Sequence, residues 1–329
     1  MPHFLACLIR GGLPAGVIWL LASTAPASAA SDDWFYRSWQ SDEGLPDNTV
    51  HGLAQTSDGY LWIGMASGLA RFEGIRFENF SPTNFVAPPN RGTMAMLRSR
   101  DGGLRLAMER GAIVYLDAGS TRVFTAGADL PNMIPNGLAE DAEGGLWIAY
   151  RGGAVCRLKD GKVTAFTARD GLPPGTEICA LAGDNEGRIW FAKAGQLGIF
   201  RDGAFHTVHQ FEPLPARLAT AKTGGVWLCS GFRLFKIEVT GEFQDLGQFH
   251  PAQANTIATA LLEDQEGAVW IGTSYSGLFR HDDSGFETVE TTHQEIFSLA
   301  EDREGNLWIG TGGGGLNRVR RRAVKLEGI

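Results

Sequence analysis

The sequence predicts an all-β fold, a seven-bladed β-propeller of four-stranded antiparallel blades. An eleven-residue pattern, EDREGNLWIGT at 301–311 and EDQEGAVWIGT at 263–273, recurs along the chain with a spacing typical of propeller blades, about 40 residues. Six of the nine Trp share the phase of this pattern, and helical periodicity is absent. A lone four-stranded sheet leaves both faces open, whereas a ring of such sheets buries them. Repetition at this period therefore indicates a propeller.

One position, the Trp of LWIG, marks each copy of the pattern. Gly stands three residues before every marker, and an acidic residue precedes that Gly in every copy except the one with Thr223. Asp-Gly and Glu-Gly between apolar runs indicate tight hairpins, because Gly accepts the positive φ that such turns need. Seven copies predict seven blades. The markers are Trp62, Arg105, Trp147, Trp190, Trp227, Trp270 and Trp308.

Each copy is expected to contain four short strands. The first precedes the hairpin, as at 298–300, and the second follows it, as at 307–311. A Gly-containing turn leads to a third strand such as 277–280, and another turn leads to a fourth such as 286–289. Successive side chains of a strand point to opposite faces. The marker Trp and the apolar residue after it should therefore pack against the two neighbouring blades.

The N-terminus has the pattern of a secretory signal peptide. Arg10 precedes a short apolar run, and a stretch of small residues with an A-x-A motif predicts cleavage near Ala29 or Ala30. An uncleaved membrane anchor is the alternative, but the run is short for a span. The predicted organisation is a signal peptide at 1–30 and a propeller at 31–329, in a periplasmic or extracytoplasmic protein.

Net charge and cysteine content argue against a nucleic-acid-binding protein and against a disulfide-rich scaffold. A formal net charge of −8 argues against nucleic acid as a partner, because binding to phosphates needs a basic face. Behind the predicted leader stand Cys156, Cys179 and Cys229, an odd number without paired spacing. They do not form a disulfide framework and are expected to be buried free thiols.

Two stretches of the first copy carry a family resemblance: DEGLPDNTVHGLAQ at 42–55 and DGYLWIGMASGLARFEGIRFENF at 58–80. Their pattern resembles the two-component regulator propeller repeat. The resemblance implies the periplasmic sensor region of a hybrid or other sensor histidine kinase. Such proteins usually carry two seven-bladed propellers, an immunoglobulin-like domain, a membrane helix and a cytoplasmic kinase. This chain has no phosphoacceptor His box and no ATP-binding Gly-rich motif. We therefore expect a non-enzymatic sensing module whose partners include the missing second propeller, membrane and kinase parts.

Two segments compete for the fourth strand of blade seven. DWFYRSW at 33–39 would close the ring from the N-terminus, and AVKL at 323–326 stands at the offset of that blade's own fourth strand. One hypothesis is that the natural chain continues into a second propeller and that this is a fragment. The alternative is that one end strand lies outside the ring. A paired AVKL with an unpaired N-terminal strand would favour the first, and the reverse pairing would count against it.

The loops that join one blade to the next are the expected ligand site. They are rich in Asn, Thr and Pro with few charges, which suits a neutral polar ligand such as an oligosaccharide. Asn and Pro are also common in any loop, so turn formation alone is the competing interpretation. The candidate residues are Asp47, Asn48, His51, Asn90, Asn132, Asn136, Thr176 and Asn255.

A propeller enzyme is the second function class. DNEGRIWFAKAG at 184–195 is similar to the repeat of streptogramin lyases, and that resemblance implies a catalytic His and Glu at the channel mouth. Only His51 stands at the start of a first strand, and it has no evident partner. His206 and His209 fall on opposite faces of a strand. We therefore predict no catalytic residue, no metal site and no cofactor; a protein-interaction scaffold is the third possibility.

Overall fold

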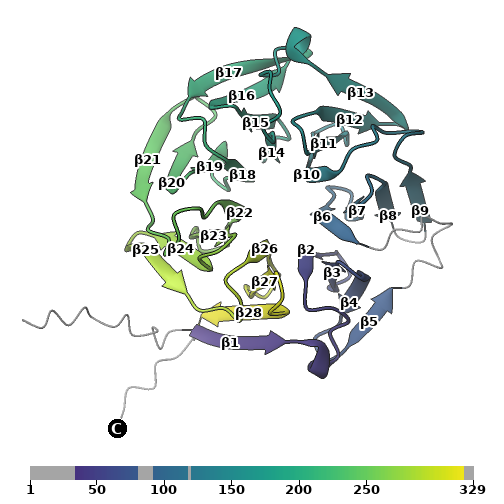
Figure 1. Ribbon diagram of the computed structural model, residues 1–329, viewed down its shortest axis with the longest axis vertical. Helices are drawn as coiled ribbons and strands as arrows, with labels where there is room; N and C mark the ends of the chain where they lie inside the picture. Colours follow the sequence, from purple (N-terminus) through teal and green to yellow (C-terminus); the bar gives the residue numbers. More distant parts are fainter. Residues whose placement is uncertain (1–33, 81–91, 118–119, 322–329) are drawn as a thin grey trace, which may run out of the picture. The chain divides into compact units, whose positions relative to one another are not determined.

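The computed structural model describes residues 34–80, 92–117 and 120–321. These residues form seven four-stranded antiparallel sheets, which are the blades of a β-propeller, and the predicted fold is confirmed. The predicted leader at 1–30 lies outside the described residues. The first strand of each blade lies closest to the centre of the ring, and the fourth lies at the outside (Figure 1).

The strands follow the chain from one blade to the next. Blade one contains β2 (Val50–Gln55), β3 (Leu61–Met65), β4 (Gly68–Phe72) and β5 (Phe77–Phe80). Blade two contains β6 (Thr93–Arg98), β7 (Leu104–Met108), β8 (Ile113–Asp117) and β9 (Ser120–Phe124). Blade three contains β10 (Pro135–Glu140), β11 (Leu146–Tyr150), β12 (Val155–Lys159) and β13 (Lys162–Phe166). Blade four contains β14 (Ala180–Gly183), β15 (Ile189–Lys193), β16 (Gln196–Arg201) and β17 (Ala204–Gln210).

The remaining three blades repeat this order. Blade five contains β18 (Ala216–Thr220), β19 (Val226–Ser230), β20 (Arg233–Ile237) and β21 (Phe243–Gln248). Blade six contains β22 (Ala258–Glu263), β23 (Val269–Thr273), β24 (Leu278–Asp282) and β25 (Gly285–Val289). Blade seven contains β26 (Ile296–Glu301), β27 (Leu307–Thr311), β28 (Leu316–Arg321) and, as its outer strand, β1 (Trp34–Trp39). Two short 3-10 helices, η1 (Ser41–Glu43) and η3 (Ala168–Asp170), lie in connections.

The N-terminal strand closes the ring. β1 pairs antiparallel with β28 from Trp34 opposite Arg321 to Trp39 opposite Leu316, and it takes the fourth position of blade seven. The competing segment at 323–326 lies outside the described residues. Because the N-terminal strand is paired in the ring, the strands of blade seven do not support the hypothesis that the chain continues into a second propeller.

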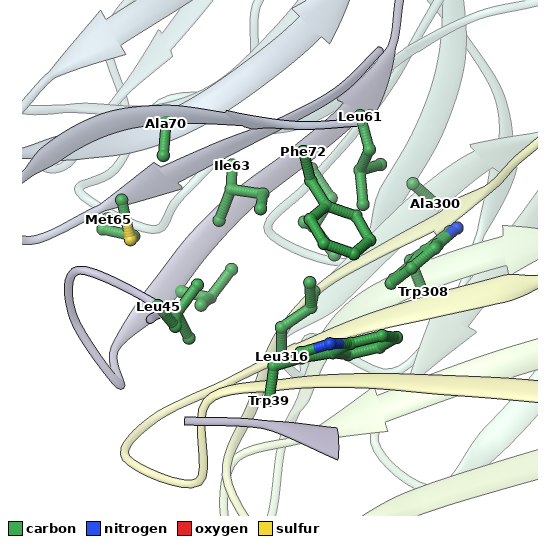
Figure 2. Close-up of a cluster of buried hydrophobic side chains, with 12 residues drawn as sticks. Trp39, Leu45, Leu61, Ile63, Met65, Ala70, Phe72, Ala300, Trp308 and Leu316 are labelled. Atoms are coloured by element: carbon green, nitrogen blue, oxygen red, sulfur yellow. The ribbon is translucent and has the colours of Figure 1, made fainter. Parts of the chain in front are cut away.

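A cluster of aromatic side chains fastens this closing strand. Trp39 stacks on Trp308 with ring centroids 5.3 Å apart, and it meets Phe72 of blade one edge-on at 5.2 Å. Figure 2 shows Trp39 and Leu316 beside Trp308, with Phe72 and Ile63 of blade one facing them. The first described strand thus joins blade seven to blade one.

The Trp-plus-apolar pair packs as predicted. Trp308 belongs to the buried cluster shared with blade one, whereas the next residue, Ile309, belongs to the cluster shared with blade six. Trp147 and Ile148 divide in the same way between blades four and two. Each interface between neighbouring blades is therefore filled by one Trp or its substitute from one side and one branched or aromatic residue from the other.

An aspartate six residues before the marker Trp organises each regular hairpin. In blade six, Asp264 Oδ1 accepts the backbone N–H groups of Glu266 (3.0 Å) and Ala268 (2.8 Å), and Oδ2 accepts the indole N–H of Trp270 at 2.7 Å. The acidic residue beside the turn Gly, which the sequence pattern emphasises, does not make this bond. Equivalent indole bonds join Asp141 to Trp147, Asp184 to Trp190 and Asp302 to Trp308.

The irregular blades replace this bond in different ways. In blade one, the hydroxyl of Thr56 accepts the indole N–H of Trp62 at 2.9 Å. In blade five, the indole of Trp227 donates instead to Glu263 of blade six at 2.9 Å. In blade two, Arg105 stands for the Trp and forms ion pairs with Asp101 and Asp117. A polar partner for the marker side chain is thus retained in these degenerate copies.

The Glu before the aspartate ties neighbouring blades together. Glu140, Glu263 and Glu301 accept the backbone N–H of a turn residue in the preceding blade, from Arg100 at 2.7 Å, Lys222 at 2.6 Å and Gln265 at 2.9 Å. Gln55 accepts from Arg303 in the same way across the junction of blades seven and one, at 3.0 Å. In the repeated Glu-Asp pair, the Asp carboxylate therefore holds its own hairpin and the Glu carboxylate holds a turn of the preceding blade.

Replacing Asp264 with Ala should lower the free energy of unfolding by about 3–5 kcal/mol, because three donors lose their acceptor in a buried turn. Urea denaturation measures the change. Glu266→Ala is the matched control, since this side chain is 59% exposed and its ion pair with Arg321 is at the surface. A D264A loss no larger than that of E266A would contradict the role of the aspartate.

Replacing Trp39 with Ala should destabilise the protein by about 3–5 kcal/mol, because it leaves a cavity between blades seven and one. Phe35→Ala on the same strand is the control, since Phe35 is 50% exposed. Thermal and urea unfolding of the two variants give the comparison. Equal stability of the two variants would show that β1 does not fasten the ring through Trp39.

Candidate functional site

A cavity of about 230 Å³ lies where the first strands of all seven blades meet. Each blade contributes one residue at an equivalent place: the second residue of the first strand, or, in blade four, the residue just before the strand. We call these seven residues the channel ring. They are His51, Met94, Asn136, Cys179, Arg217, Thr259 and Phe297.

β-bulges produce the ring in five blades. The register between first and second strands shifts at His51, Met94, Asn136, Thr259 and Phe297, each of which is passed over in the pairing. A bulged residue leaves the ladder and its side chain can be aimed away from the regular alternation. In these five blades the ring residue therefore stands outside the regular ladder between the first and second strands.

His51 is held in the ring by an aromatic neighbour. Its imidazole stacks on Phe297 of blade seven with ring centroids 4.6 Å apart. Burial lowers the pKa of His51, and the nearby carboxylates of Asp47 and Glu109 only partly oppose this effect. At neutral pH the imidazole is therefore uncharged and presents one donor and one acceptor.

Arg217 is the charged member of the ring. Its Nε donates to the carbonyl of Thr259 at 3.0 Å, and its Nη1 donates to the carbonyl of Ala216 at 3.2 Å. Burial lowers its pKa, with a small opposing effect of Cys229, yet a guanidinium stays protonated at neutral pH. The described residues that line the cavity include no Asp or Glu.

The structure brings two of the sequence-predicted site residues, His51 and Asn136, into the cavity lining. Asp47 and Asn48 instead stabilise the loop between β1 and β2. The side chain of Asp47 accepts the backbone N–H of Thr49, and that of Asn48 accepts the backbone N–H of Ser41, both at 2.9 Å. The other predicted residues do not line the cavity. Asn132 and Thr176 are exposed, Asn90 lies outside the described residues, and Asn255 lines a separate pocket.

That separate pocket lies between blades five and six and has a volume of about 500 Å³. Phe211, Leu214, Phe232 and Ile257 give it an apolar lining, to which Asn255 is added. It stands apart from the ring residues. The predicted loop residue Asn255 thus lies in a second, more apolar pocket.

The far ends of the first strands border another hollow, of about 600 Å³. Several of its charged residues make contacts between blades: Glu140 accepts from the hydroxyl of Ser99 at 2.6 Å, and Arg100 donates to the carbonyl of Asp184 at 2.8 Å. This end is consequently built for joining blades, whereas the channel ring has unoccupied polar groups.

Other site chemistry is limited in the described part of the chain. Cys156, Cys179 and Cys229 are buried free thiols, as predicted, and burial raises the pKa of Cys179 to about 12. No three His, Cys, Asp or Glu side chains gather as a metal site within residues 34–80, 92–117 and 120–321. A search of the same residues finds no helix with the length and apolar character needed to span a membrane.

Comparison with known families identifies the repeat. Residues 44–67, 253–275 and 292–313 match the family described as "Two component regulator propeller". These segments lie in blades one, six and seven. The chain carries the two-component regulator propeller repeat, and the resemblance seen in the sequence is confirmed. No curated protein matches this chain.

Solved structures with the same fold include two-component sensor domains and streptogramin lyases. The extracellular domain of a hybrid two-component system from B. thetaiotaomicron has a TM-score of 0.70 and 20% identity, over 89% of this chain and 40% of that one. A streptogramin B lyase has a TM-score of 0.73 and 16% identity, over 90% of this chain and 100% of that one. At such identities the likeness shows the fold alone. This chain spans less than half the length of the two-component domain.

The pKa of His51 should be measurable by NMR and should fall below its usual value of 6.5. The folded protein binds this proton less tightly than the unfolded chain. His51 therefore lowers the free energy of unfolding as pH falls below about 6.5, and has no such effect above it. His51→Gln assigns the resonance and removes this pH-dependent part. A midpoint at or above 6.5 would contradict the buried, neutral imidazole.

Proposed function

We propose that this chain is the extracytoplasmic sensing propeller of a two-component signalling system and that it binds a small polar ligand at the channel ring. The repeat match in blades one, six and seven is the observation that carries the signalling assignment. The extracellular domains of hybrid two-component systems that share the fold support it.

The channel ring supports ligand binding at that place. It presents the amide of Asn136 and the imidazole of His51, and the bulges place both residues outside the strand ladder. The hydroxyl of Thr259 also lines the cavity, where it donates to the carbonyl of Ile296 and keeps its oxygen as an acceptor. The cavity of about 230 Å³ lies below the range of about 300–1,000 Å³ for drug-sized ligands. A monosaccharide, or one end of an oligosaccharide, has a suitable size and hydrogen-bonding capacity.

The remaining parts of the signalling system belong to the same proposal. A second propeller, a membrane segment and a kinase would convert ligand binding into a response, in line with the greater length of the two-component domain. Export through a signal peptide cleaved near Ala29 or Ala30 would place the propeller in the periplasm. Under this proposal the chain itself performs no catalysis.

The lyase alternative has weaker support. A catalytic His needs a positioned partner within hydrogen-bond reach. The described residues show His51 stacked on Phe297, and the carboxylates of Asp47 and Glu109 act on it without a hydrogen bond. The shared fold does not decide between lyase and sensor. The geometry of the ring therefore favours binding over acid–base chemistry.

A thermal-shift screen of the purified chain against mono- and oligosaccharides tests the proposal. A ligand of the folded state should raise the melting temperature in a saturable way, by an amount set by its concentration relative to Kd. Asn136→Ala should weaken binding about tenfold or more, and Asn132→Ala is the matched control outside the cavity. The absence of any shift with all saccharides would argue against saccharide sensing and favour a protein partner.

A further inference from the structure

The charge of Arg217 is not neutralised by the protein. Within the described residues, its guanidinium bonds two backbone carbonyls, those of Thr259 and Ala216, and forms no ion pair. Nη2 has no hydrogen-bond partner among these residues. Arg217 nonetheless lines the cavity beside Thr259 and Leu218. The channel ring therefore holds an open cationic group.

Other arginines of the propeller interior show that this is unusual for the molecule. Arg105 contacts two carboxylates, Asp101 and Asp117, and Arg280 contacts Asp282 and Glu287. Arg318 lacks an ion pair but lies over the indole rings of Trp39 and Trp308, 5.5 and 5.6 Å from their centroids. Arg217 has neither kind of partner in the described residues.

An unpaired charge in such surroundings does not stabilise a fold. Removing a cation from bulk water is unfavourable unless an opposite charge or a full set of acceptors replaces the water. Two carbonyls orient the guanidinium of Arg217 and leave its charge uncompensated. The cavity lining offers no carboxylate to compensate it. An anion entering the cavity would supply what the protein lacks.

The free part of the guanidinium determines which anion fits. With Nε and one N–H of Nη1 occupied, the remaining N–H groups are one on Nη1 and two on Nη2. Adjacent N–H groups of a planar guanidinium match the two oxygens of a carboxylate and also suit a phosphate or sulfate. Asn136 and His51 line the same cavity and can bond hydroxyl groups of the same ligand, and the Thr259 oxygen can accept from one.

We propose that the channel ring binds a small acidic ligand of monosaccharide size, whose carboxylate or comparable oxyanion is held by Arg217. The inference rests on the proposed function and names the ligand class of its site. Arg217 supplies the charge recognition. The uncharged members of the ring recognise the remainder of the ligand.

Isothermal titration with glucuronate and with glucose, at equal ionic strength and neutral pH, tests the inference. Glucuronate should bind at least tenfold more tightly than glucose, and its affinity should fall as salt is added. Arg217→Gln should weaken glucuronate binding at least tenfold and leave glucose affinity within twofold. Inorganic phosphate is the third probe, and its competition with glucuronate would show that an oxyanion alone is recognised.

Two further variants keep the test decisive. Arg201→Gln changes an exposed arginine of blade four and should leave glucuronate affinity unchanged. Arg217→Lys keeps a positive charge without the planar fork and should retain part of the affinity, so it answers the question even if R217Q folds poorly.

The outcomes separate the two proposals. Equal affinity for glucuronate and glucose, or full glucuronate affinity in R217Q, would overturn the acidic-ligand inference and leave saccharide sensing intact. If none of the three probes binds the folded protein, the acidic-ligand inference is wrong. A neutral saccharide found by the thermal-shift screen would then still support the sensing function.

Discussion

The bond between a buried aspartate and the indole of the marker Trp is the interaction on which the four regular blades depend. Asp264 shows how much one side chain does: it closes its hairpin through two backbone N–H groups and fixes the rotamer of Trp270 through a third bond. The oriented Trp then fills the interface with the next blade. Local turn geometry and inter-blade packing are therefore set by the same carboxylate. The Glu beside it extends this control across the interface, because its oxygens accept a backbone N–H from the preceding blade.

The blade count and strand order could be predicted because they follow from these repeated requirements. A Trp at constant phase, a Gly at the turn and a following apolar residue are demanded in nearly every copy, so the sequence displays them directly. The indole partner was harder to predict, because each regular hairpin contains two or three acidic residues and only the three-dimensional turn shows which one reaches the ring nitrogen. Blade seven was ambiguous for a similar reason: 33–39 and 323–326 both satisfy strand periodicity, and pairing with β28 depends on contacts far apart in sequence.

The candidate site was only partly predictable. His51 and Asn136 could be found as polar residues near the start of a first strand. Loop composition does not indicate Arg217 and Thr259, because the cavity is lined by residues within the strands. Period-two alternation also fails at this place, because a bulge shifts the register by one residue. Most of the ring residues stand at a constant distance in sequence before the marker Trp, so this offset locates them. Whether a carboxylate lies near Arg217 can be read only from the structure.

The closing role of β1 has a consequence for the order in which the protein can fold. The side chain of Gln40, just after β1, donates to the carbonyl of Gly314, which lies 274 residues further along the chain. The outer strand of blade seven is thus synthesised long before β28, the strand with which it pairs. Blades one to six are each made of continuous sequence and can form their hairpins locally, but β1 must stay unpaired until β28 exists. Completion of the ring is a long-range event, and such contacts are slow to form. During that interval Trp34 and Trp39 are exposed apolar side chains. A chaperone could bind them in competition with β28.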